Sequence, residues 1–170
     1  GIYICRYHAD QRGWDVVPRR LDCARTQAQA PEIAMNVQGD LAVVWYEREQ
    51  DAIRVCARHM VSLEETWVPY PVVLQSAPGE VSSLHTAMDP EGHIHVVWCR
   101  EEAGGYQVYS TGYQADTATW DPEPRSLGAP RARPLFPQLA VNEVGKGLVI
   151  WPEATAEGDR IVACHYDPGS

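Results

Sequence analysis

The sequence predicts an all-β fold built from three copies of one unit, and two series of tryptophans support this prediction. The first series, Trp45, Trp98 and Trp151, recurs every 53 residues, and each member ends an apolar run. A second series keeps the same interval: Trp14, Trp67 and Trp120. Two independent markers with one period indicate a tandem repeat, and 53 residues is within the range of β-propeller blades.

The composition bounds the class of protein. With 45% apolar and 22% charged residues, the 170-residue chain is typical of one globular domain. No apolar run approaches the roughly 18 residues needed to span a bilayer. The net charge of −9 repels phosphate backbones, so neither a membrane nor a nucleic acid is an expected partner. The chain begins at Gly1 rather than Met, so the lack of a signal peptide says little about the compartment.

The cysteines show no CxxC spacing, and their odd number prevents complete pairing within one chain. We interpret them as small buried hydrophobic residues on strands, which favours a reducing, cytoplasmic compartment. They are Cys5, Cys23, Cys56, Cys99 and Cys164.

The first two strands of each unit form a predicted hairpin. Strand A follows Pro31, Leu84 and Pro137 and ends at an Asn or Asp that lies three residues before a glycine. This is turn chemistry, because the side chain bonds to the local backbone and glycine accepts positive φ. The turns are Asn36 to Gly39, Asp89 to Gly92 and Asn142 to Gly145. Strand B follows as LAVVW, IHVVW and GLVIW, apolar on both faces, which indicates burial between neighbouring sheets.

A charged loop leads from strand B to strand C, which covers 55–60, 108–113 and 161–166; Ile2 and Tyr7 fit the same places. Strand D then reads Trp, three residues, Pro, two residues, Leu. Proline cannot donate to a β-ladder, so strand D is expected at an edge. Four antiparallel strands with a proline-marked edge describe a propeller blade.

The predicted units are strands C and D of a split blade in 1–30, full blades in 31–83 and 84–136, and a partial blade A–C in 137–170. Three blades cannot close a ring, which usually takes about four to eight. We expect closure by self-association, as a homodimer with six blades or a homotrimer with nine; the alternative is a fragment of a longer propeller. The lone strand D could complete the partial blade of a second chain, but the extra strand C then has no slot.

The unit P-x-I-A-x-N-x-x-G-x-x-x-V-V-W resembles bacterial propeller repeats of the sialidase-like, BNR type. Those repeats often carry an Asp-box, S-x-D-x-G-x-x-W, before the strand D tryptophan. The corresponding segments here are YHADQRGW, MVSLEETW and YQADTATW, with Asp10 and Asp116 four residues before tryptophan and Leu63 in the middle copy. The resemblance covers the chain as architecture, and it also allows a secreted or periplasmic protein.

Candidate ligand-binding residues are those that differ between the three units while the surrounding sequence pattern repeats, and that lie near the expected mouth of a central channel. Carboxylates and guanidinium groups there could hold a sugar or small polar molecule, or could simply be solvated surface ion pairs. At the start of strand A they are Glu32, His85 and Gln138. After strand B they are Glu47, Arg48, Arg100, Glu101 and Glu153.

Other conspicuous residues have simpler interpretations. His93 and His95 share one strand face, but the other units have no histidine there, so no metal or other cofactor is expected. The Trp45, Trp98 and Trp151 series is expected to pack between blades. The other series is expected to anchor strand D, with sugar stacking as the alternative.

The sequence therefore predicts a binding or assembly scaffold. The more specific form of this prediction is a lectin-like site for a glycan or small polar ligand. A protein-interaction platform is the first alternative, and part of a glycoside-processing propeller enzyme is the second. An enzyme is the less favoured interpretation. A sialidase would need three arginines, and Arg48 and Arg100 have no third counterpart. We predict no catalytic residue.

Overall fold

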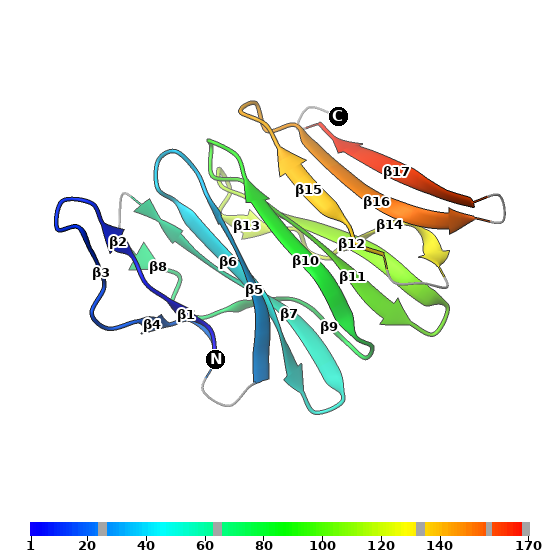
Figure 1. The fold of residues 1–170 in the computed structure, drawn as a ribbon, viewed down its shortest axis with the longest axis horizontal. Coiled ribbons are helices and arrows are strands. Elements are labelled where there is room, and N and C mark those ends of the chain that lie inside the picture. Colours follow the sequence, from blue (N-terminus) through cyan, green and yellow to red (C-terminus); the bar gives the residue numbers. More distant parts are fainter. Residues whose placement is uncertain (24–26, 63–65, 132–134, 156–157, 168–170) are drawn as a thin grey trace.

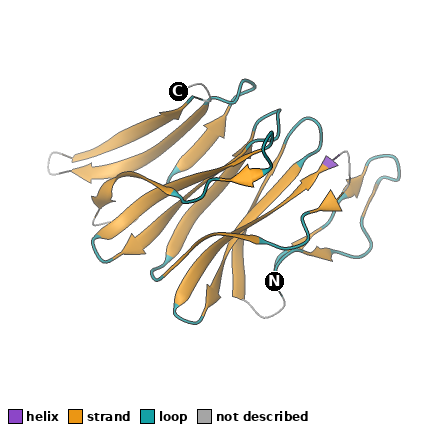
Figure 2. Ribbon diagram, turned by 180° about the vertical axis from the view of Figure 1, so that it is seen from behind, coloured by secondary structure: helices purple, strands orange, loops and turns teal. Residues whose placement is uncertain are grey.

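A computed structural model describes residues 1–23, 27–62, 66–131, 135–155 and 158–167, which excludes Leu63. The predicted all-β fold class is confirmed: the described ranges contain antiparallel sheets and no α-helix. Accordingly, no helix in the described ranges has the length and apolar character to cross a membrane. The sheets fan out in chain order from the N-terminus to the C-terminus (Figure 1). Seen from behind, they lie face against face as blades do (Figure 2).

Two complete sheets form the middle of the molecule. The first blade consists of β5 (Gln27–Met35), β6 (Leu41–Glu49), β7 (Ala52–Val61), β8 (Thr66–Trp67) and β9 (Val72–Ala77). The second blade consists of β10 (Val81–Met88), β11 (Ile94–Glu102), β12 (Gly105–Gln114), β13 (Thr119–Trp120) and β14 (Arg125–Arg131). Strand D is thus two short strands on either side of its proline, both paired with strand C. Proline, which lacks an N–H, interrupts the ladder there.

Smaller sheets flank these two blades. The third blade has three strands, β15 (Gln138–Val141), β16 (Gly147–Thr155) and β17 (Gly158–Tyr166). The N-terminal half-blade has β1 (Tyr3–Ile4), β2 (Tyr7–His8), β3 (Gly13–Trp14) and β4 (Arg19–Arg20). It pairs β1 with β4 and β2 with β3, the pattern of strands C and D in the full blades.

The hairpin between strands A and B has the same geometry in each blade. Asn36 accepts hydrogen bonds from the amides of Gln38 and Asp40 at 3.1 and 2.9 Å. Gly39 donates to the Asn36 carbonyl at 3.1 Å and has a φ of 89°. A left-handed φ is strained for most residues with a side chain, so glycine is the natural choice at this position.

Strand B is longer than the sequence indicates. The segments expected as charged loops continue the strand to Glu49, Glu102 and Thr155, and each pairs with the start of strand C across only two intervening residues. The expectation of an open charged loop is therefore wrong. Residues of alternating polarity in these segments form cross-strand pairs instead.

The core lies between blades, as the apolar strand B pattern predicts. Val44 and Val55 of the first blade pack against Val96 and Trp98 of the second. In the next interface, Val97 and Val108 pack against Val149 and Trp151. Trp45 packs against Ile2 and Leu21 of the half-blade. Each tryptophan of the Trp45 series therefore packs into the interface between its own blade and the blade that precedes it in the chain.

The outer face of the third blade carries apolar residues that lack a neighbouring sheet. Val97 and Val108 are 1% and 0% exposed, whereas their counterparts Ile150 and Ile161 are 36% and 69% exposed. The side chains keep the character of an interblade face, and the described chain provides no blade to cover them.

The other markers diverge between units. Trp67 is buried, Trp120 is half-buried and Trp14 is exposed, so anchoring of strand D is complete only in the first blade. The prediction of buried cysteines is correct for Cys56 and Cys99, but Cys5 and Cys23 are exposed and Cys164 is intermediate; none of these five described residues forms a disulfide.

Candidate functional site

The innermost strands bring three candidate residues into one row. Strands β5, β10 and β15 lie side by side across the three blades (Figure 1). Glu32, His85 and Gln138 occupy the same place in each unit, and the structure brings all three together. The Gln138 Nε2 atom lies 3.1 Å from His85 Nε2, and His85 Nδ1 lies 3.7 Å from a Glu32 carboxylate oxygen.

The direction of the hydrogen bonds in this row follows from the side-chain amide nitrogen of Gln138, which can only donate. His85 Nε2 therefore accepts from Gln138, and a neutral imidazole must carry its proton on Nδ1, directed to Glu32. The three side chains are half-buried to exposed, so they keep groups available to a ligand. A carboxylate, an imidazole and an amide in one line offer both donors and acceptors at the inner edge of the blades.

A β-bulge, which the sequence did not indicate, orients two of these residues. The pairing of β5 with β6 shifts register between Gln29 and Glu32, and the pairing of β10 with β11 shifts between Ser82 and His85. Ala30 and Ser83, at matching positions, have φ of 48° and 49°. β-Bulges change the direction of side chains and are over-represented next to active sites. A positive φ is unfavourable for residues other than glycine, and strain of this kind clusters at functional sites.

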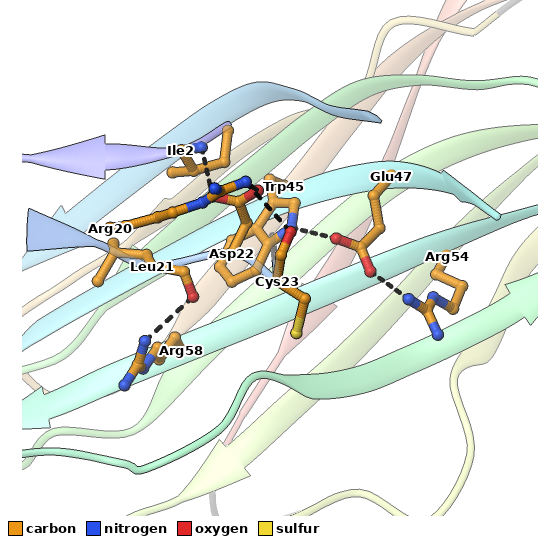
Figure 3. A network of polar contacts seen from close by, with 9 residues as sticks. All are labelled: Ile2, Arg20, Leu21, Asp22, Cys23, Trp45, Glu47, Arg54 and Arg58. Atoms are coloured by element: carbon orange, nitrogen blue, oxygen red, sulfur yellow. Dashed lines mark hydrogen bonds and ion pairs between the residues drawn. The ribbon is translucent and has the colours of Figure 1, made fainter. Parts of the chain in front are cut away.

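Three candidates after strand B do not face an open channel mouth. Glu47, Arg100 and Glu153 occupy one repeat position, and all three are buried. Glu47 accepts from Trp45 Nε1 at 3.2 Å and pairs with Arg54 at 2.5 Å (Figure 3). Their expected place among exposed loop residues is therefore corrected: they form polar contacts inside and between blades.

Glu153 and Arg100 connect neighbouring blades. Glu153 of the third blade pairs with Arg131 of the second, and with Arg160 of its own blade at 2.6 Å. Burial alone would raise the pKa of the Glu153 carboxyl, but hydrogen bonds from the two guanidinium groups lower it. Arg100 donates to Gln75 Oε1 at 2.8 Å and to the Ile53 carbonyl at 2.9 Å, both in the first blade.

The remaining candidates of this set, Arg48 and Glu101, lie at the surface. Arg48 pairs with Glu80 at 2.5 Å, and the Glu101 amide donates to the Glu80 carbonyl at 2.8 Å. Both contacts fix the connection from strand D to strand A between the first two blades. Exposed pairs of this kind contribute little stability and leave the side chains accessible.

The two histidines of the HxH pair have separate environments. His93 Nδ1 pairs with Asp89 at 2.9 Å, whereas His95 lies against the Tyr166 ring with centroids 4.8 Å apart. Among the described residues, Asp89, Glu91 and His93 are close enough to share a cation, but Asp89 also holds the turn through the His93 amide at 2.9 Å. Asp89 therefore has a structural role in the turn.

Comparison with known proteins supports the architecture. The chain matches no protein-family model and no curated protein sequence. Among solved structures it is similar to endo-arabinase from Bacteroides thetaiotaomicron VPI-5482, with a TM-score of 0.54 and 11% identity. The match covers 89% of this chain and 60% of that one, so the chain spans less than two thirds of its structural neighbour. At this identity the likeness establishes a β-propeller-like fold.

Proposed function

We propose that this chain is a propeller scaffold that binds a carbohydrate or a similar small polar ligand along its inner strands. The observation that carries the proposal is the contiguous row of Glu32, His85 and Gln138, held by bulges in the first two blades. Mixed donors and acceptors suit ligand hydroxyl groups. The structural likeness to an endo-arabinase, a propeller glycosidase, supports a carbohydrate as the ligand class.

Calorimetric titration with neutral oligosaccharides, including arabino-oligosaccharides, tests the proposal. Loss of one ligand hydrogen bond in His85→Ala or Gln138→Ala should weaken binding about three- to ten-fold. The control Glu143→Gln changes an exposed side chain in the turn after β15 and should bind as wild type does. Equal affinity of all variants would contradict a role for the row.

The competing functions give different results in the same samples. Cleavage of the oligosaccharides, followed by chromatography, would favour a glycoside-processing enzyme. Absence of both binding and cleavage would leave the protein-interaction platform. No cofactor is needed for the binding we propose.

We also propose that the exposed face of the third blade is covered when copies of the chain associate into a ring. The exposed side chains Ile150 and Ile161 occupy positions that are buried by a following blade elsewhere in the chain. Light scattering should then give two or three times the 19.0 kDa chain mass, and Ile161→Glu should lower it to one. A monomeric wild-type protein would overturn this part of the proposal and favour a longer propeller.

A further inference from the structure

A cavity lies between the second and third blades, apart from the inner-strand row of Glu32, His85 and Gln138. Its volume is about 380 Å³, within the range of roughly 300 to 1,000 Å³ for small-molecule sites. Strands β11, β12 and β14 form one wall, and β15, β16 and β17 form the other. The cavity thus lies within an interblade interface.

The repeat shows what is missing from this interface. In the interface between the first and second blades, called the first interface below, the matching positions hold Ile94 and His59, both buried. The His59 ring contacts the Tyr113 ring in a tilted arrangement, with the centroids 4.4 Å apart. Between the second and third blades the same positions are Gly147 and Gly112. Two side chains that fill the first interface are therefore absent from the second, and a hollow takes their place.

Backbone geometry does not require these two glycines. Neither has a positive φ. A Cβ added to Gly147 would lie 3.4 Å from Tyr166 Cβ, and one added to Gly112 would lie 3.4 Å from Asp121 Oδ2, both ordinary contacts. Since a side chain could be placed at either position, the consequence of glycine here is the open space itself.

Three wall positions also change from an apolar to a polar side chain. Ala42 and Ala57 of the first interface have the counterparts His95 and Ser110. Val72, which pairs with Ala57 across β7 and β9, has the counterpart Arg125. Burial lowers the pKa of His95, and its Nε2 has no hydrogen-bond partner among the described residues. A hollow that only reflected loose packing would keep apolar walls, because a buried polar group without a partner is unfavourable.

We propose that this cavity binds a polyhydroxylated molecule of monosaccharide size. Hydroxyl groups can pair with the Ser110 hydroxyl, the Asp121 carboxylate and the Arg125 guanidinium on one wall. The apolar C–H face of such a ring can lie against Tyr166 and Val149 on the other. The site shares no residue with the inner-strand row and does not depend on it.

Backbone amide NMR with a panel of neutral pentoses and hexoses tests the site. At least one sugar should cause saturable shifts of the Ser110 and Gly112 amides. Gly147→Ile restores the side chain of the first interface, so it should abolish these shifts while the melting temperature stays equal or rises. His85→Ala should leave them unchanged, which separates this site from the inner-strand row.

Two results would overturn the proposal: no panel member causes saturable shifts at Ser110 and Gly112, or the shifts persist when isoleucine fills the cavity. If Gly147→Ile does not fold, Arg125→Val decides. It restores the valine of the first interface and removes a polar wall group, so it should weaken the saturable binding. Unchanged affinity in that variant would count against the site.

Discussion

Replacement of Arg100 tests whether the buried position after strand B is structural. The Arg100 side chain is 1% exposed and donates to Gln75 Oε1, to Ile53 O and to the carbonyls of Ala77 and Pro78 at 2.7 and 3.1 Å. Burial lowers the pKa of the guanidinium, yet arginine remains charged at neutral pH. Arg100→Met keeps much of the apolar stem and removes every donor.

The magnitude follows from the acceptors left behind. Each buried acceptor that loses its partner costs about 1 to 3 kcal/mol. Part of this is offset, because the variant no longer buries a charge, so we expect a net loss of about 3 to 5 kcal/mol. That is a large share of the roughly 5 to 15 kcal/mol that stabilises a typical domain.

Urea unfolding followed by tryptophan fluorescence measures this loss. The matched control is Arg48→Met, which removes an exposed ion pair with Glu80 and should cost about 1 kcal/mol or less. If Arg100→Met were as stable as Arg48→Met, the hydrogen bonds of Arg100 to the first blade would contribute nothing to the free energy of unfolding. That result would refute our reasoning. A loss of ligand affinity without a loss of stability would return Arg100 to the binding candidates.

Two further predictions concern backbone fit and pH. Gly79→Ala should destabilise the fold by about 2 kcal/mol or more, because its φ is +91° and an added Cβ would lie 1.9 Å from the Glu101 carbonyl oxygen; Gly158→Ala, with open space around it, should cost about 1 kcal/mol in the same unfolding assay. Burial alone would raise the pKa of the Asp22 carboxyl, but hydrogen bonds from Arg20 and the Ile2 amide lower it below 3.8. The stability from these bonds is therefore present above about pH 4 and lost as the pH falls through the lowered pKa, so Asp22→Asn should show a flatter acid dependence of unfolding; an unchanged dependence would contradict this.

The sequence predicts the frame of each blade because local chemistry decides it. Apolar runs ending at Trp45 and Trp98 bury strand B on both faces, and glycines such as Gly39 and Gly92 fix the hairpin before it. The bulges had no such signal. Their positive φ falls on Ala30 and Ser83, and neither residue type favours that conformation. Only the structure therefore shows how Glu32 and His85 are oriented.

The sequence contains a signal for the cavity, the two glycines, but it can be recognised only when it is known which blade faces pack together. Gly112 lies within strand C and Gly147 begins strand B, but they are 35 positions apart along the chain. Once the blades are packed, both lie on one interface. A comparison of interfaces, rather than of single repeat positions, would have found them.

Variation at a repeat position does not by itself mark a ligand site. Strand B and strand C pair in the same register in each blade, so the varying residues have fixed cross-strand partners: Glu47 with Arg54, Arg100 with Gln107, and Glu153 with Arg160. Where glutamate becomes arginine, its partner changes from arginine to glutamine. This change avoids two like charges side by side in a buried ladder.

The inner-strand row lacks this compensation. Glu32 and His85 pair on strand B with Val44 and Val97, which do not change in character between the blades. A polar residue that varies opposite a constant apolar partner has no packing reason to vary. By this criterion the sequence alone could have separated the buried polar contacts of Glu47, Arg100 and Glu153 from the row where we propose that ligand binds.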